Sequence, residues 1–171
     1  MKSRLTELWS PWRADYVASD KSSTGTSDMA KESCFLCESH SLPADSNSLV
    51  IHKGTHNFII LNKYPYSTGH LLVVPYSHEG NLLNLSRESR EESTLLIDSS
   101  VDTLVEEYRP DGFNIGMNLG RAAGAGVPDH IHIHVVPRWN GDTNFMPVIG
   151  DSKVQPENLE STYKRLQQHW S

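Results

Sequence analysis

The chain has 171 residues, of which 37% are hydrophobic and 21% are charged, and its formal net charge is −6. This size and composition are typical of one globular domain, and no apolar run approaches the length of a membrane span. The acidic balance argues against a protein that coats nucleic acid, although a local cluster of donors can still hold a small phosphate ligand. We therefore expect neither a nucleic-acid partner nor a membrane association.

The first 33 residues differ in composition from the rest. They begin "MKSRLTELWSPWR", which lacks the apolar stretch and cleavage site of a signal peptide, so we expect a cytoplasmic protein. The stretch "LWSPWRADYV" concentrates aromatic residues that typically pack onto a core or a partner subunit. Residues 19–33 are mostly Ser, Thr, Gly and charged residues, which indicates a flexible segment. We interpret 1–33 as an N-terminal extension, 34–150 as the main domain and 151–171 as a helical tail.

Short apolar runs predict strands. Residues 48–52, 57–62 and 70–75 are rich in β-branched side chains and are bounded by Asn, Gly and Pro, which is typical of strands. Residues 112–118, "GFNIGMN", predict a further strand.

Two helices are predicted. In residues 86–108, Ser86 can cap the start, and apolar side chains recur near helical spacing. These are Leu96, Ile97, Val101, Leu104, Val105 and Tyr108. The tail, 156–170, carries one apolar stripe of Leu159, Tyr163, Leu166 and Trp170. The order of elements predicts an α+β fold with a mostly antiparallel sheet, one long helix and a C-terminal helix.

Residues 129–138 read "DHIHIHVVPR", with histidine at every second position. Positions i, i+2 and i+4 share a face in a strand but not in a helix. The pattern therefore predicts a strand with His130, His132 and His134 on one face and the apolar residues between them in the core. Such a row offers a nucleophile, hydrogen-bond donors or metal ligands near neutral pH. The alternative is that these histidines are ordinary solvent-exposed strand residues, but three histidines in strict alternation favour a functional site.

This run resembles the His-φ-His-φ-His-φ-φ signature of the histidine triad family of nucleotide hydrolases and transferases. "LNKYPYSTGHLLVVP" resembles the family's first substrate-binding stretch, and "MNLGRAAGAGVPDH" resembles its phosphate loop. With "CFLC", the resemblance extends from about residue 34 to 138. The flanks "LWSPWRADYV" and "RWNGDTNFMPVIG" resemble a bacterial subgroup related to diadenosine tetraphosphate phosphorylases.

The resemblance implies catalytic roles for the triad. A neutral imidazole can attack phosphorus and leave again, which divides one difficult displacement into two easier ones. The resemblance gives the nucleophilic role to His132. It gives His134 contact with phosphate and the leaving group, and His130 the position of the outer triad histidine.

The resemblance also implies substrate-binding residues. Asn62 is the counterpart of a residue that binds a ribose hydroxyl, and His70 resembles a binding-site histidine. For the phosphate, Asn118 supplies an amide, while Gly124 and Gly126 allow backbone N–H groups to approach closely. Each of these residues has an alternative reading as an ordinary turn residue. The apolar "FII" at 58–60 is either a base-stacking slot or part of the core.

The pair Cys34 and Cys37 has the two-residue gap of zinc thiolate pairs. The resemblance suggests His78 and His130 as the other two ligands of a closed, structural zinc site. Strand alternation places His130 on the same face as His132, so zinc binding requires it to lie at the strand entrance. A reduced dithiol without metal and a thioredoxin-like redox motif are the alternatives.

We expect an enzyme that attacks the α-phosphate of dinucleoside polyphosphates and passes the nucleotidyl group from histidine to water or phosphate, with no catalytic cofactor. A nucleoside phosphoramidate hydrolase or nucleotidylyl transferase is the nearest alternative. A non-catalytic nucleotide sensor and a metal-binding protein that uses all three histidines are alternatives of other classes. The resemblance further implies a homodimer or dimer-based oligomer, with the helix at 86–108 and the aromatic N-terminus as candidate interfaces.

Overall fold

The computed structural model describes residues 34–43, 45, 47–150 and 156–170. The aromatic N-terminal stretch and the segment predicted to be flexible lie outside these residues. The helices are α3 (Phe35–Ser41), α4 (Arg87–Tyr108), α5 (Met146–Ile149) and α6 (Leu159–Gln167). The strands are β1 (Val50–Lys53), β2 (Asn57–Leu61), β3 (Leu71–Pro75), β4 (Gly112–Met117) and β5 (Ile133–Arg138), and short 3-10 helices lie at Leu82–Asn84 and Arg121–Ala123. Within the described ranges, no helix has the length and apolarity to cross a membrane.

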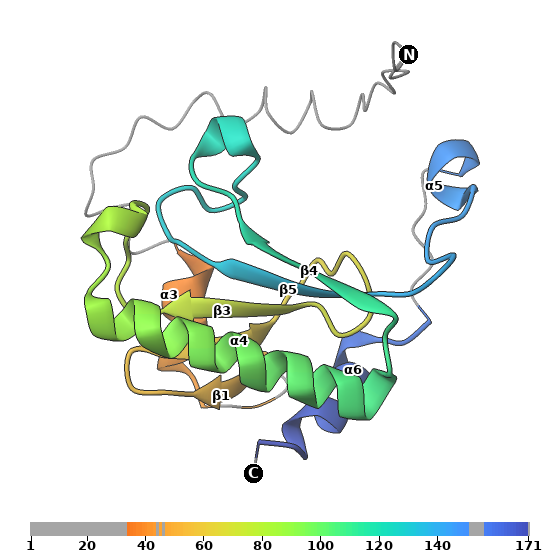
Figure 1. Ribbon diagram of the computed structural model, residues 1–171, viewed down its shortest axis with the longest axis horizontal. Coiled ribbons are helices and arrows are strands. Elements are labelled where there is room, and N and C mark those ends of the chain that lie inside the picture. Colours follow the sequence, from red (N-terminus) through yellow and green to blue (C-terminus); the bar gives the residue numbers. More distant parts are fainter. Residues whose placement is uncertain (1–33, 44, 46, 151–155, 171) are drawn as a thin grey trace.

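The five strands form one sheet in the order β1-β2-β3-β5-β4, and every neighbouring pair is antiparallel. Strand β5 lies between β3 and the edge strand β4, so that His134 has Leu72 on one side and Gly116 on the other. The predicted α+β fold, with an antiparallel sheet, one long helix and a C-terminal helix, is confirmed (Figure 1).

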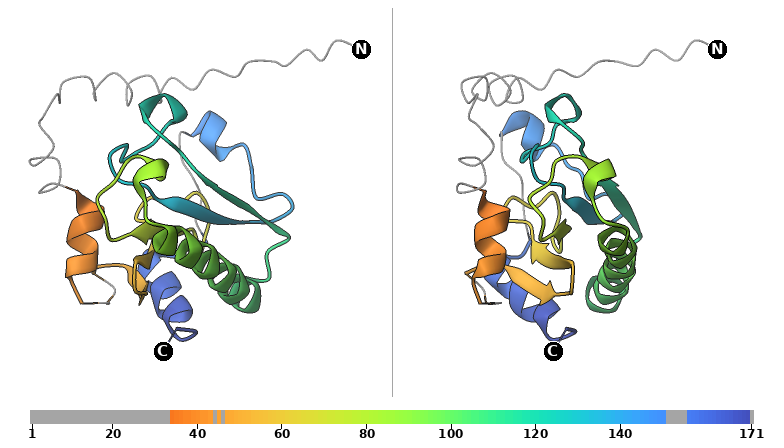
Figure 2. Two further views of the ribbon diagram at one scale, coloured as in Figure 1. Left: turned by 60° about the vertical axis from the view of Figure 1, so that its left-hand side comes forward. Right: turned by 90° about the vertical axis from the view of Figure 1, so that its left-hand side faces the viewer.

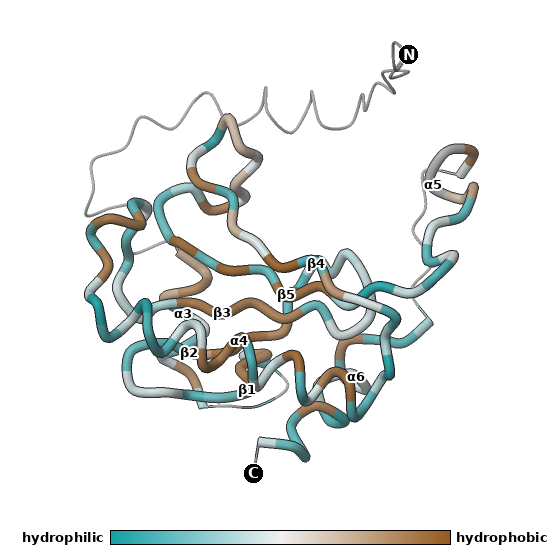
Figure 3. The backbone as a smooth tube through the Cα atoms, in the orientation of Figure 1, coloured by the Kyte–Doolittle hydropathy of each residue, from teal (hydrophilic) through white to brown (hydrophobic). Residues whose placement is uncertain are grey.

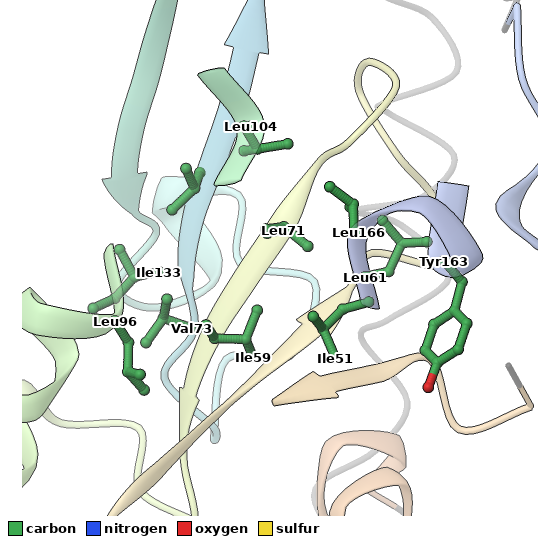
Figure 4. Close-up of a cluster of buried hydrophobic side chains, with 11 residues drawn as sticks. Ile51, Ile59, Leu61, Leu71, Val73, Leu96, Leu104, Ile133, Tyr163 and Leu166 are labelled. Carbon is green, nitrogen blue, oxygen red and sulfur yellow. The ribbon is translucent and has the colours of Figure 1, made fainter. Parts of the chain in front are cut away.

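Helices cover both faces of the sheet. Because successive strand side chains point to opposite faces, a strand buried on both sides must be apolar throughout, as "NFIIL" nearly is in β2. Figure 2 shows the sheet between α3 and α4, and Figure 3 shows the hydrophobic residues concentrated in its strands. The cluster on the α4 side is drawn in Figure 4 and comprises Ile51, Ile59, Leu61, Leu71, Val73, Leu96, Leu104, Ile133, Val135, Tyr163 and Leu166.

The opposite face, on the α3 side, carries the histidines. Its core cluster comprises Cys34, Leu36, Val50, Phe58, Ile60, Leu72 and Val74. Since Leu72 lies directly opposite His134, both side chains point to this face. Phe58, Ile59 and Ile60 are all fully buried, so the "FII" stretch is core and offers no open base-stacking slot.

Helix α4 begins and packs largely as predicted. The side chain of Ser86 accepts a hydrogen bond from the backbone N–H of Ser89, which caps the helix. Leu96 and Leu104 are buried, but Val105, predicted on the same apolar face, is 45% exposed. Small hydroxyl residues occupy the rest of the buried face, namely Ser89, Ser93, Ser100 and Thr103.

Hydrogen bonds from Asn57, the first residue of β2, connect the sheet to α4. The Asn57 side chain is fully buried, donates to the Ser89 carbonyl (2.9 Å) and to Glu92 Oε2 (2.8 Å), and accepts from the hydroxyls of Ser89 and Ser93. We expect Asn57→Ala to lower the free energy of unfolding by about 3 kcal/mol, because it removes the four hydrogen bonds of this buried side chain and leaves the Ser89 hydroxyl without its acceptor. Urea titration measures the loss. The exposed Asn140→Ala is the control, and equal stability of the two variants would contradict this account.

Candidate functional site

The histidine strand begins later than predicted. Strand β5 starts at Ile133, so of the three histidines only His134 lies within it. The N–H of Ile131 donates to the carbonyl of Glu79 (2.8 Å) rather than to a neighbouring strand. The alternation still places Ile131 and Ile133 in buried positions. The segment that carries His130 and His132 is therefore an extended entry to β5, and this entry separates the two histidines from the sheet ladder.

His130 lies among the cysteines. Its Nδ1 is 3.4 Å from Cys34 Sγ and 3.5 Å from Cys37 Sγ, and His78 Nδ1 is 3.3 Å from Cys37 Sγ. One ligand atom from each of these four residues lies within 4.8 Å of the others. The ring of His130 is fully buried there, so the structure gives it no access to a substrate. Its expected catalytic role as an outer triad histidine thus does not fit its burial.

The four side chains fit a tetrahedral metal ion. Zinc–sulfur bonds near 2.3 Å and zinc–nitrogen bonds near 2.0 Å imply a separation of roughly 3.5 Å between S and N ligands of one ion. The measured distances of 3.3–3.5 Å match this value. Nε2 of His130 donates to the carbonyl of Pro75 (2.8 Å), which leaves the Nδ1 lone pair directed at the cysteines. Both cysteines are free thiols rather than a disulfide.

His132 is held with one particular nitrogen available. Its Nδ1 is 2.9 Å from the backbone carbonyl of His130, and a carbonyl can only accept, so Nδ1 carries the proton. Nε2 of the neutral ring therefore keeps its lone pair. Burial lowers the pKa of His132, against the opposing effect of the hydrogen bond to His130, which favours this neutral form at pH 7. The same residue that faces the cysteines thus orients His132 through its backbone.

His134 is held in the opposite tautomer by His70. The backbone N–H of Tyr66 donates to His70 Nδ1 (3.0 Å), so the proton of a neutral His70 lies on Nε2. That Nε2 is 2.9 Å from His134 Nδ1, which must accept. The proton of His134 therefore lies on its Nε2, a buried atom for which the described residues provide no hydrogen-bond partner. Burial, followed by repulsion from His132 when that ring is protonated, lowers the pKa of His134 to about 4, so His134 is neutral at pH 7.

His70 lies behind the triad rather than in the open site. The sequence predicts it as a substrate-binding residue, but its ring is fully buried against His134, which indicates an indirect role. The preceding residue must be glycine for the chain to take this course. The φ of Gly69 is +77°, and a Cβ there would clash with Leu104 Cδ2 at 2.7 Å. Asn62 lies beside it, with Nδ2 3.3 Å from His70 Nδ1 and Oδ1 accepting from the N–H of Tyr64.

The predicted phosphate loop connects β4 with the triad. Asn118 follows β4, and its Nδ2 donates to the carbonyl of Gly124 (3.4 Å). Gly124 has a φ of +83° at the end of a 3-10 turn, a conformation that favours glycine. Gly126 lies two residues further along, and its proposed role rests on its place in the sequence. Asn118 and His134 line the same cavity of about 750 Å³.

Comparison with known proteins identifies the family. The HIT domain family matches residues 44–141. The chain belongs to the HIT family. It is 36% identical over 170 residues to a Mycobacterium tuberculosis protein named AP-4-A phosphorylase, covering 99% of this chain and 87% of that protein. It is 26% identical to the adenosine 5'-monophosphoramidase hnt1 of Schizosaccharomyces pombe, covering 75% of this chain and 92% of that protein.

A solved HIT structure has the same fold. The Zn-bound histidine triad family protein from Mycobacterium smegmatis is 30% identical, has a TM-score of 0.63, and covers 81% of this chain and 94% of its own. The HIT match lies inside residues 34–150, and those domain boundaries stay a prediction.

Sequence reasoning did not identify Tyr66 in this HIT site. Its backbone N–H sets the tautomer of His70, and its ring stacks on His134 with centroids 5.6 Å apart and planes 19° apart. The residue lies inside the quoted stretch "LNKYPYSTGH", but a tyrosine in a loop carries no signal for either contact. Both contacts depend on how this loop folds over the end of β5.

Proposed function

We propose that this HIT protein attacks the α-phosphate of dinucleoside polyphosphates, such as diadenosine tetraphosphate, through a nucleotidyl-histidine intermediate. Its enzyme class, a HIT-type nucleotide hydrolase or phosphorylase, is established by the family and by the near full-length relative named AP-4-A phosphorylase. One observation carries the proposed mechanism. The bond from His132 Nδ1 to the His130 carbonyl leaves Nε2 as the nucleophilic nitrogen.

In the first step, the lone pair of His132 Nε2 forms a bond to the α-phosphorus. The bond from phosphorus to the bridging oxygen breaks, and its electron pair leaves with the distal nucleotide. Asn118 and the loop at Gly124 and Gly126 are proposed to hold the phosphate, and Asn62 the ribose. Donors already in place stabilise the charge that develops on the phosphoryl oxygens.

His134 donates a hydrogen bond in this step and keeps its proton. A neutral His134 has one ring proton, on Nε2, and transfer of that proton would leave an imidazolate, since Nδ1 only accepts from His70. A nucleoside triphosphate departs as a stable anion and does not need the proton. His134 therefore acts as an electrostatic stabiliser of the leaving group, a role that requires the tautomer fixed by His70.

In the second step, water or inorganic phosphate attacks phosphorus, and the electron pair of the P–N bond returns to Nε2. An attacking water releases its proton to solvent, whereas inorganic phosphate attacks through an oxygen that is already ionised. Product analysis with diadenosine tetraphosphate, with and without inorganic phosphate, tests the proposal. ADP that appears only with phosphate indicates a phosphorylase, and AMP with ATP indicates a hydrolase. Absence of turnover and of an acid-labile nucleotidyl-histidine, despite tight binding, would instead indicate a nucleotide sensor.

A nucleoside phosphoramidate hydrolase or nucleotidylyl transferase is the alternative, supported by the likeness to the Schizosaccharomyces pombe monophosphoramidase. Adenosine 5'-monophosphoramidate offered beside diadenosine tetraphosphate separates the two. A larger kcat/KM for the phosphoramidate would favour the alternative. The hypothesis of a metal protein that uses all three histidines fits the structure poorly. Of the three, His130 alone belongs to the cluster with the cysteines, and a neutral His134 has no lone pair to offer, since its Nδ1 accepts from His70 and its Nε2 carries the proton.

We expect His70→Phe to lower kcat by roughly 10–100-fold, as is typical when the residue that orients a reactive histidine is lost. The phenyl ring fills the buried space but cannot donate to His134, so its tautomer is no longer fixed. KM for diadenosine tetraphosphate changes less than kcat, because the buried ring does not touch the substrate. His52→Phe is the matched control, because His52 lies on β1 and its ring packs against Trp170 with the centroids 4.8 Å apart. An unchanged kcat in His70→Phe would exclude the positioning role.

We further propose that Cys34, Cys37, His78 and His130 bind one structural zinc ion, supported by their geometry and by the Zn-bound relative. When bound, zinc would hold helix α3, through Cys34 at its N-cap and Cys37 within it, against His78 and the entry of β5. None of these four residues lines the cavity that contains His134, which fits a structural rather than a catalytic ion.

We also propose a homodimer or a dimer-based oligomer. Helix α4 exposes Leu95 and Val105, which is apolar surface that a second subunit can cover. Light scattering should give a mass of at least twice the 19.2 kDa of the chain. Leu95→Lys should shift that mass toward the monomer if α4 forms the interface. A parent protein that is monomeric at micromolar concentration would contradict the proposal.

A further inference from the structure

The cavity beside the triad extends well beyond the phosphate site. It has a volume of about 750 Å³ and lies over β4 and β5, with His134 in its lining. Cavities of this size hold whole small-molecule ligands. The chemistry proposed above uses only the part lined by His134 and Asn118, so the rest of the space has no assigned occupant.

The floor of the cavity beside His134 is open because Gly116 lacks a side chain. Gly116 lies directly opposite His134 on the neighbouring strand, so a side chain there would point to the same face. A Cβ built at Gly116 meets no atom within 4 Å. The fold therefore tolerates a side chain at this position, and the glycine serves to keep the space next to His134 free.

Tyr66 forms an aromatic wall next to the same histidine. Its ring stacks on His134, lies 4.6 Å from the centroid of His70, and is part of the cavity lining. Tyr66 is 55% exposed as a residue, so a ligand in the cavity can reach it. Exposed aromatic rings of this kind are platforms on which nucleobases stack.

The charges of the cavity favour a neutral, polar ligand. Among the described residues that line it, Arg138 is the one permanent cation, and its guanidinium donates to both carboxylate oxygens of Asp142 and to Asn114 Oδ1. This pairing leaves little positive charge for a phosphate chain. Away from His134 and Asn118, the lining also has neutral amides and hydroxyls, contributed by Ser67, Thr68, Thr143 and Asn144. Such groups suit a sugar and a base.

We propose that this cavity binds the nucleoside of the leaving nucleotide. The base stacks on Tyr66, and the absence of a side chain at Gly116 leaves room for the nucleoside beside His134. The inference rests on the proposed function, because it requires a leaving group that departs past Nε2 of His134. It extends that function by naming the feature that distinguishes a dinucleotide from a mononucleotide substrate. The second nucleoside, rather than the number of phosphates, would determine the preference.

The test compares diadenosine tetraphosphate with adenosine 5'-tetraphosphate, which has the same four phosphates but no second nucleoside. For Gly116→Val and Tyr66→Leu, we expect the ratio of kcat/KM for the dinucleotide to that for the mononucleotide to fall about tenfold or more. Tyr66→Phe retains the aromatic face and should keep the ratio within about threefold of the parent.

Gly112→Val is the matched control for the strand. Gly112 lies on β4 opposite Arg138, a Cβ there also meets nothing within 4 Å, and the residue is not part of the cavity lining. In Gly112→Val, the ratio of kcat/KM for the dinucleotide to that for the mononucleotide should equal the ratio in the parent protein. If Gly116→Val does not fold, as judged by circular dichroism, Tyr66→Leu still tests the proposal from a different element.

The outcomes separate this inference from the proposed function. Equal losses on both substrates in Gly116→Val and Tyr66→Leu would mean that the cavity does not distinguish the second nucleoside, and would overturn the inference alone. A parent protein that processes neither substrate would overturn the proposed function and this inference with it. A selective loss on the mononucleotide would assign the cavity to the distal phosphates instead.

Discussion

Replacing His132 with alanine is expected to lower turnover of diadenosine tetraphosphate by roughly 10³-fold or more, which is typical of losing a catalytic nucleophile. No other described imidazole can replace it. The Nδ1 of His130 faces Cys34 and Cys37, and the Nδ1 of His134 is occupied by His70. The variant should also fail to form the acid-labile nucleotidyl adduct, which mass spectrometry of the quenched enzyme measures directly.

The same variant should retain its zinc, because His132 is not among the four clustered ligands. Zinc content measured together with activity therefore distinguishes a lost nucleophile from a collapsed site. His56→Ala is the control, since His56 is exposed and lies on the β1–β2 turn away from the triad. Parental activity in His132→Ala would disprove the assignment, and loss of zinc from it would favour the metal-binding alternative.

The features that periodicity encodes were predictable from the sequence. Alternation placed Ile131 and Ile133 inside, and the spacing of Leu96 and Leu104 predicted the buried face of α4. These patterns record which side of an element meets the core, and burial follows directly from them. Val105 is the instructive exception. The small residues Ser93 and Ser100 let α4 approach the sheet closely along a face that a hydrophobic pattern does not reveal.

The remaining features depend on contacts between distant segments. The short helix α3 was not predicted, because "FLCESHS" is too short for a clear helical period. The resemblance named His130 both as a triad residue and as a zinc ligand. Only the bend before β5 shows that its ring faces the cysteines while its carbonyl orients His132. The burial of His70 and the stacking of Tyr66 on His134 likewise arise from the folded loop between β2 and β3.

The zinc proposal leads to the second large expected effect. Cys37→Ser should lose the ion and lower Tm by roughly 10 °C, since a structural zinc site contributes several kcal/mol to folding. Cys37 contacts both His78 and His130, so its loss removes the link between α3 and the two histidines. Metal content by mass spectrometry and thermal unfolding by circular dichroism measure the two effects. Ser39→Ala, in the same helix, is the control and should keep both at the parental level.

A chelator distinguishes lost zinc from a lost thiol contact. If zinc is the source of the stability, a strong chelator lowers the Tm of the parent to that of Cys37→Ser and has no further effect on the variant, because both changes remove one interaction. If the cysteines only form thiol hydrogen bonds, the parent contains no zinc and the chelator leaves its Tm unchanged. Activity should follow metal content, since the carbonyl that orients His132 belongs to His130. A zinc-free parent with full activity and stability would therefore contradict both the structural site and its coupling to the nucleophile.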